Sequence, residues 1–266
     1  MGSVKREIGD DELEPVSKRY QDRVIAFIDI IGFKKIVEKT VTDQAYLGSI
    51  IDAIAEIRGQ FIDDPKSPFQ QMVRTVLFED DFDTQVIQVS DCMVISKLAN
   101  IPGALQYLVG DVTLAIHILI SHGLLCKGRI ECGKVFHTDK YIIGPAYNAA
   151  YLGEEAEFVP AITLSKGLRE FGTNNRSDDV QVEKHFDTFV IQHIHDNYYI
   201  DYFNDLEGYI DVFETPAEHY GKLRRIIEDE YCIATDYKIK AKYLWMIDKF
   251  NASCVVKEKK LQPIEK

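Results

Sequence analysis

Residues 24–33 of this chain read VIAFIDIIGF. The apolar residues of this stretch have the bias of a buried β-strand that ends at Asp29. Gly32 then allows a tight turn, so a helix is expected to begin near Phe33. A carboxylate at the end of a buried strand is costly to desolvate unless it meets the N–H groups of the next helix or a cation. Asp29 is therefore either a helix cap or a cation ligand.

Length, charge and cysteine content restrict the class of protein. The 266 residues, 46% of them hydrophobic, suffice for one large domain or a domain with an appendage. A formal net charge of −12 argues against a nucleic-acid or anionic-membrane surface, because such surfaces are basic. We expect a cytoplasmic protein, since no apolar run reaches the length of a membrane span and no signal peptide is evident. The five cysteines have no CxxC spacing and are expected to be reduced core residues.

A second acid follows about sixty residues later. Residues 85–96 read QVIQVSDCMVIS, in which two short apolar strands flank the pair Ser90 and Asp91. This pair suits a tight turn, so the segment is expected to form a hairpin with Asp91 near its tip. An Asp at such a tip can serve the turn alone. It becomes a functional candidate if the fold brings it to Asp29.

The rest of the chain alternates helical and strand patterns. Helices are expected over residues 43–61, 102–121, 218–230 and 237–250, and one begins at Gly144-Pro145. Strands are expected over residues 73–78, 124–136, 161–164, 188–194 and 198–202. The strand over 124–136 carries Lys127, Arg129 and Glu131 on one face, which is either a ligand-facing or an exposed face. His193 and His195 could chelate a metal, but no third ligand is evident.

These patterns predict four segments. Residues 1–22 are a flexible N-terminal tail, and residues 23–165 form the main α/β core. Residues 166–256 form a C-terminal α/β extension that completes the domain. Residues 257–266 are expected to be a second flexible tail.

Several motifs together resemble the class III nucleotidyl cyclase domain. Residues 27–33 match the pattern Phe-x-Asp-Ile-x-Gly-Phe at every specified position. Asp91 resembles the second metal-binding Asp of that family, Gly144 and Asn148 match its Gly-x-x-x-Asn helix start, and residues 127–133 resemble its Arg-to-Gly strand. The resemblance covers residues 23–165. It implies an α/β (α+β) fold with a cyclase-like, ferredoxin-type sheet and flanking helices, assembled as a homodimer with composite active sites.

The departures from the family pattern point to a pyrimidine substrate. Purine cyclases often read the base with a Lys and an Asp at the positions that Ile87 and Tyr141 occupy here, and Leu152 stands where the family has a transition-state Arg. Residues 144–151 (GPAYNAAY) and 242–245 (KYLW) resemble instead the bacterial pyrimidine cyclases of anti-phage signalling (Pycsar).

That resemblance implies an activity. The enzyme would convert UTP to 3′,5′-cyclic UMP and pyrophosphate with two divalent ions, Mn²⁺ or Mg²⁺, and the product would activate a separate effector. A cytidylate cyclase making cyclic CMP, a purine (adenylate or guanylate) cyclase, and a catalytically inactive nucleotide-binding or interaction module remain the alternatives.

The resemblance also implies site residues. The expected metal-binding residues are Asp29, Ile30 and Asp91. The expected catalytic residues are Asp29, Asp91, Asn148 from the other subunit, and Arg129 as a substitute for the missing Arg. The expected substrate-binding residues are Ile30, Ile31, Gly32 and Phe33, whose backbone would cradle phosphates, Lys127 for the triphosphate, and Ile87 and Tyr141 near the base.

Overall fold

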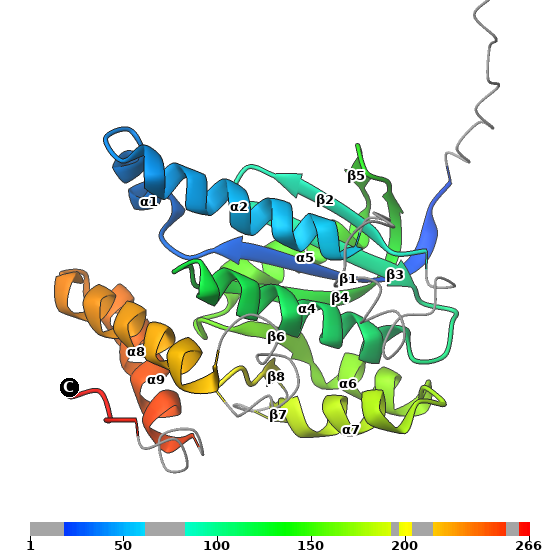
Figure 1. Ribbon diagram of the computed structural model, residues 1–266. Coiled ribbons are helices and arrows are strands. Elements are labelled where there is room, and N and C mark those ends of the chain that lie inside the picture. Colours follow the sequence, from blue (N-terminus) through cyan, green and yellow to red (C-terminus); the bar gives the residue numbers. More distant parts are fainter. Residues whose placement is uncertain (1–18, 62–82, 193–196, 204–214, 254–260) are drawn as a thin grey trace, which may run out of the picture.

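The computed structural model describes residues 19–61, 83–192, 197–203, 215–253 and 261–266 (Figure 1). The strands are β1 (Gln21–Ile30), β2 (Gln85–Val89), β3 (Cys92–Leu98), β4 (Cys126–His137), β5 (Ile142–Ile143), β6 (Ile162–Ser165), β7 (Val190–Gln192) and β8 (Asn197–Ile200). The helices are α1 (Phe33–Thr40), α2 (Gln44–Phe61), α4 (Ala104–Ser121), α5 (Pro145–Ala156), α6 (Lys166–Asn174), α7 (Val180–Phe189), α8 (Pro216–Ile233) and α9 (Tyr237–Ala252).

The described strands form one mixed sheet around β1. Its order is β2-β3-β1-β4-β6-β8-β7, and β5 pairs with β4 outside this path. β1 runs antiparallel to both β3 and β4, whereas β4 and β6 are parallel. The predicted α/β class with a helix-flanked sheet is therefore confirmed.

Helices cover both faces of the sheet at β1. Val24, Ala26 and Ile28 belong to the large hydrophobic core that also contains buried residues of α2 and α4. Ile25 and Phe27 point to the opposite face, where they pack with residues of α5. In Figure 1, α2 and α4 lie in front of the sheet and α5 lies behind it. A strand that is buried on both faces reads as a continuous apolar run, which explains why residues 24–28 lack polar alternation.

α4 is apolar almost all round. By length and composition its 18 residues could cross a membrane, contrary to the expectation that no apolar run is long enough. Within this fold, however, 83% of the helix is buried. A helix that is hydrophobic on all sides is typical of a protein core as well as of a membrane span.

Local signals fix where α5 and α8 begin. Pro145 occupies the first turn of α5, as predicted, and α8 starts with a capping box formed by Thr215 and Glu218. Gly144 lies so close to β4 that a Cβ there would come within 2.6 Å of the carbonyl oxygen of Lys134. Glycine at this position therefore allows α5 to dock directly on β4.

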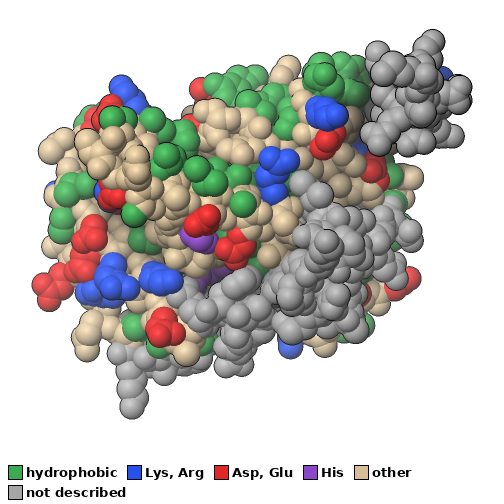
Figure 2. Space-filling model, turned by 45° about the horizontal axis from the view of Figure 1, so that its top comes forward, with side chains coloured by type: hydrophobic (Ala, Val, Ile, Leu, Met, Phe, Trp, Pro, Cys, Tyr) green, Lys and Arg blue, Asp and Glu red, His purple; other side chains and the backbone are tan. Residues whose placement is uncertain are grey.

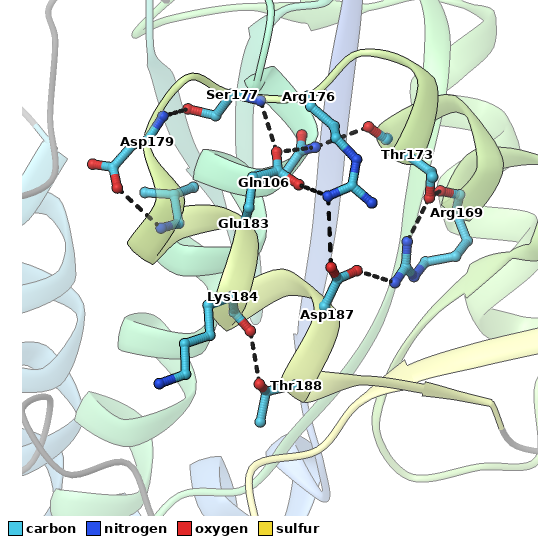
Figure 3. Close-up of polar contacts among 12 residues, drawn as sticks. Gln106, Arg169, Thr173, Arg176, Ser177, Asp179, Glu183, Lys184, Asp187 and Thr188 are labelled. Carbon is cyan, nitrogen blue, oxygen red and sulfur yellow. Dashed lines mark hydrogen bonds and ion pairs between the residues drawn. The ribbon is translucent and has the colours of Figure 1, made fainter.

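Glu183 joins α7 to its neighbours (Figure 3). Its carboxylate accepts hydrogen bonds from Gln106 Nε2 of α4 at 2.8 Å and from the backbone N–H of Ser177 at 2.7 Å. Arg176 contributes an ion pair at 3.2 Å. Because Glu183 is buried, each of these partners offsets the cost of desolvating its charge. The network fastens the loop between α6 and α7 against the start of α4.

The C-terminal part differs from the sequence expectation in its details. α6 and α7 were not anticipated, and the strand expected over 188–194 is observed only as β7 (Val190–Gln192), because Thr188 lies in the last turn of α7. The strand expected over 73–78 and the pair His193 and His195 lie outside the described residues.

The cysteines were expected to be core residues, but not all of the described ones are buried. Cys126 is buried and Cys92 is half-buried, whereas Cys132 and Cys232 are exposed, and all four are free thiols. Cys254 lies outside the described residues.

The last six residues also differ from the expectation, because they pack against the domain instead of forming a free tail. Ile264 is 2% exposed, and its backbone N–H donates to Asn251 Oδ1 at 2.9 Å.

The surface has a mixed charge pattern. On the face shown in Figure 2, acidic and basic side chains are interspersed, with hydrophobic groups between them.

A buried polar network lies on the sheet face that α5 covers, at the end of β1 opposite to Asp29. The fully buried guanidinium of Arg23 donates to Ser96 Oγ at 2.8 Å and to Asp83 Oδ2 at 2.7 Å. Ser96 Oγ also lies 2.7 Å from His137 Nδ1. Burial, followed by the positive charge of Arg23, lowers the pKa of His137 to about 3, while Asp83 opposes this shift. His137 is therefore neutral in the folded protein at neutral pH.

Acid should destabilise the fold through His137. The unfolded side chain takes up a proton near its ordinary pKa of 6.5, whereas the folded one resists protonation down to about 3. The contribution of His137 to the free energy of unfolding should thus be constant above pH 6.5 and fall below it, by up to about 1.4 kcal/mol per pH unit. Urea denaturation at several pH values between 7.5 and 4.5 measures the slope. His137→Gln should reduce it; an unchanged slope in this variant would contradict the assignment.

Candidate metal centre

The fold brings Asp29 and Asp91 together at one end of the sheet. In the antiparallel register, Asp29 of β1 stands opposite Cys92 of β3, and Asp91 is the preceding residue at the hairpin tip. One donor atom each from Asp29, Asp91 and Cys92 lies within 4.8 Å of the other two. Two carboxylates are the hard oxygen donors that Mg²⁺ and Mn²⁺ prefer, so the residue types fit a divalent cation.

Backbone contacts hold the two acids in place. Ser90 adopts a left-handed conformation with φ of 58°, which closes the two-residue hairpin. The N–H of Ile30 donates to the carbonyl of Asp91 at 3.3 Å, and the N–H of Ile31 donates to the carbonyl of Leu125 at 2.8 Å. The hairpin tip is thereby tied to the end of β1.

These contacts use two of the four backbone N–H groups, over Ile30–Phe33, that were expected to bind phosphate. Because the N–H groups of Ile30 and Ile31 are already engaged, they are not available to phosphate in this conformation. Gly32 and Phe33 lie at the start of α1. In the described part of the chain, their N–H groups donate to no backbone carbonyl in a turn, a loop or another element. Gly32 has φ of 75°, a value that glycine reaches without strain. Of the four residues expected to bind phosphate, Gly32 and Phe33 are therefore the ones whose N–H groups lie outside these backbone contacts.

Burial and a neighbouring negative charge both raise the pKa of Asp29. Burial is the main cause that raises the pKa of Asp29, and the nearby charge of Asp91 adds to it, while Lys127, the Cys92 thiol and Lys242 oppose it. Burial and the two carboxylates also raise the pKa of the Cys92 thiol, which keeps its proton. Cys92 Sγ lies 3.6 Å from an oxygen of each carboxylate. A bound cation would relieve the repulsion between the acids.

Lys127 bridges two carboxylates. Its Nζ lies 3.8 Å from Asp29 Oδ2 and contacts Glu154 Oε1 of α5 more closely. Glu154 is 4% exposed, so its charge depends on this partner. Burial lowers the pKa of Lys127, helped by Lys242 and opposed by Asp29. The expected triphosphate ligand is therefore partly neutralised by Glu154, which the sequence analysis missed.

Arg129 also forms an ion pair, with Glu131 on the same strand. Its Nε donates to Glu131 Oε1 at 2.8 Å, and its side chain is 12% exposed. α5 covers it closely, since a Cβ on Gly153 would come within 3.0 Å of Arg129 Cγ. In the role of substitute for the missing Arg, Arg129 would have to exchange Glu131 for the charge that develops on the phosphate.

The remaining expected residues lie on α5, before β5 and in β2. Asn148 is exposed on α5, where its backbone N–H bonds to the carbonyl of Gly144, and Leu152 is 60% exposed. Tyr141 is 62% exposed just before β5. Ile87 is only 8% exposed and packs in the hydrophobic cluster under α5.

Comparisons with known proteins give weak structural likenesses. No protein-family model matches this chain, and no curated protein matches it. Among solved structures, the adenylyl cyclase CyaB from P. aeruginosa matches with a TM-score of 0.43 and 13% identity, over 68% of this chain and 94% of that one. The guanylyl cyclase domain of the RhoGC fusion protein from the aquatic fungus Blastocladiella emersonii matches with a TM-score of 0.46 and 14% identity, over 69% and 98%. A bacterial light-regulated adenylyl cyclase matches with a TM-score of 0.42 and 11% identity, over 78% and 99%.

Removing Lys127 should leave a buried charge at Glu154. We expect Lys127→Met to lower the free energy of unfolding by about 3 kcal/mol, because Glu154 then lacks its cation. Lys127→Met combined with Glu154→Gln should recover much of that loss, since no buried charge remains. Urea denaturation measures both. Lys134→Met on the same strand is the control: its partner Asp22 is 58% exposed, so the effect should be much smaller. Additive losses in the double variant would contradict the pairing.

Proposed function

We propose that this protein is a class III nucleotidyl cyclase that converts a nucleoside triphosphate to a 3′,5′-cyclic nucleotide and pyrophosphate. One observation carries the proposal: Asp29 and Asp91, both picked out by the cyclase-like sequence motifs, meet at the ends of adjacent strands. A site with two half-buried carboxylates is suited to hold cations against a triphosphate.

The reaction joins the ribose 3′-oxygen to the α-phosphorus and breaks the bond from that phosphorus to the oxygen of the leaving pyrophosphate. The 3′-hydroxyl proton passes to solvent. Asp29 and Asp91, with Ile30, would hold two divalent ions, Mn²⁺ or Mg²⁺, which activate the 3′-oxygen and neutralise the triphosphate when bound. Gly32 and Phe33 would offer N–H groups to terminal phosphate oxygens at the start of α1.

Positive side chains near the acids would help to bind the triphosphate. Lys127 has one carboxylate partner at close range and one at 3.8 Å, so a phosphate could replace the more distant Asp29. Lys242 of α9 is near enough to lower the pKa of both Asp29 and Lys127. Lys242 lies in the KYLW segment that resembles pyrimidine cyclases, and we assign it a role in placing the triphosphate.

A pyrimidine base is the proposed specificity, with UTP preferred to CTP. Ile87 and Tyr141 stand at the two positions where purine cyclases use a donor and an acceptor, and neither can make that pair. The product would be cyclic UMP, a second messenger in anti-phage defence that acts through a separate effector. Cytidylate and purine cyclase activities are the alternatives.

The active form is proposed to be a homodimer with composite sites. Asn148 is exposed on α5, as expected of a residue that reaches into a partner's site. Exposed hydrophobic side chains accompany it on and beside α5: Tyr141, Ile143, Tyr151 and Leu152 are between 42% and 62% exposed. Apolar groups gathered around a polar residue are typical of a protein interface.

A nucleotide-binding module without catalysis is the second candidate. Two observations favour it: Leu152 occupies the position of the transition-state Arg, and Arg129 forms an ion pair with Glu131. Such a module would bind a nucleotide without releasing pyrophosphate.

Turnover should depend on both acids. With Mn²⁺ and each of ATP, GTP, CTP and UTP, we expect cyclic UMP as the main product by mass spectrometry. Asp29→Asn and Asp91→Asn should each lower the rate by about a hundredfold or more, because a metal ligand is lost. Asp178→Asn, an exposed acid between α6 and α7, should have little effect. Cyclic AMP as the main product would reject pyrimidine specificity, and nucleotide binding without any product would favour the inactive module.

Composite sites predict complementation between two inactive variants. Asp91→Asn and Asn148→Ala damage the same site from different subunits. A mixed dimer therefore contains one doubly damaged site and one intact site, so equimolar mixing after subunit exchange should restore about a quarter of wild-type activity. No recovery, with exchange verified by native mass spectrometry, would show that both residues act within one chain.

A further inference from the structure

We propose that the sulfur of Cys92 is a third metal ligand beside Asp29 and Asp91, so that the site also takes a thiophilic divalent cation such as Cd²⁺ or Zn²⁺. The inference rests on the proposed metal-binding role of the two acids, but it does not depend on the reaction. It concerns which cations the site selects.

The distances around Cys92 suit coordination. Cys92 Sγ lies 3.6 Å from Asp29 Oδ1 and 3.6 Å from Asp91 Oδ1. In a tetrahedral zinc site, metal–sulfur bonds of about 2.3 Å and metal–oxygen bonds of about 2.0–2.2 Å place sulfur and oxygen about 3.5–3.7 Å apart. The three donor atoms therefore already have the sulfur-to-oxygen spacing of one coordination shell.

The strand register gives Cys92 its position. Cys92 is the direct cross-strand partner of Asp29, and paired residues of neighbouring strands project to the same face of a sheet. Cys126 pairs instead with Ile30 and packs in the core on the opposite face. The placement is thus particular to Cys92 and is not a general property of cysteines in this sheet.

Charge and softness favour a thiophilic ion. When the cation binds, the Cys92 S–H bond breaks, a metal–sulfur bond forms and the proton passes to solvent. The thiolate and two carboxylates then surround a divalent ion with three negative charges. Soft thiolate ligands favour Zn²⁺ and Cd²⁺, whereas Mg²⁺ and Mn²⁺ draw mainly on the oxygens. Thiophilic ions should therefore compete with Mn²⁺ for the two acids.

Metal binding to the full-length protein tests the proposal without any measure of activity. Titration with Co²⁺ should produce a thiolate-to-cobalt charge-transfer absorption in wild type, and Cys92→Ser should abolish it. Cys92→Ser should weaken Cd²⁺ binding by about tenfold or more in calorimetry and change Mn²⁺ binding much less. Wild type should release about one more proton per Cd²⁺ than the variant in weakly buffered solution.

Matched variants separate the possible outcomes. Cys132→Ser and Cys232→Ser remove exposed thiols and should keep the absorption band. Circular dichroism and the Tm of Cys92→Ser and Cys92→Ala establish that the fold is retained. A band that persists in both Cys92 variants, or equal Cd²⁺ affinity in wild type and Cys92→Ser, overturns the role of Cys92. If Mn²⁺ binding still depends on Asp29 in that case, the proposed metal pair stands; if wild type binds no divalent cation, both fail.

Discussion

The register of β1 between β3 and β4 determines which charged side chains meet at the end of the sheet. It places Asp29 opposite Cys92 on one side and Lys127 on the other. A slip of one residue would turn Asp29 toward the core formed with α2 and α4 and would expose buried apolar groups. Gly128 permits the close approach of the strands, because a Cβ there would overlap the carbonyl oxygen of Phe27.

The strand register brings together two acidic side chains whose negative charge is only partly neutralised. Asp29 and Asp91 are half-buried neighbours of like sign, and their nearest cation, Lys127, is shared with Glu154. Such an arrangement is costly in the absence of a ligand, because burial and the charge of Asp91 both oppose ionisation of Asp29. A divalent cation offsets both costs. The half-buried thiol between the carboxylates adds a donor that a purely oxygen-based site would lack.

The two faces of the sheet have different roles. The face under α2 and α4 is filled by the large hydrophobic core. The face under α5 carries the acids at one end of β1 and the network of Arg23, Ser96 and His137 at the other. Functional side chains on β-strands supported by a packed core are positioned more firmly than side chains on loops.

The sequence alone determined the elements whose signals are local. The apolar run before Asp29, the turn at Ser90-Asp91 and the helical spacing of α2, α4, α8 and α9 were readable because each depends on neighbours within a few residues. The approach of the two acids followed from a motif resemblance. The folded chain adds pairings across long sequence separations: Lys127 with Glu154, and Cys92 with Asp29. These depend on strand register and on how α5 docks, and no local pattern encodes which charges will meet when separate segments pack.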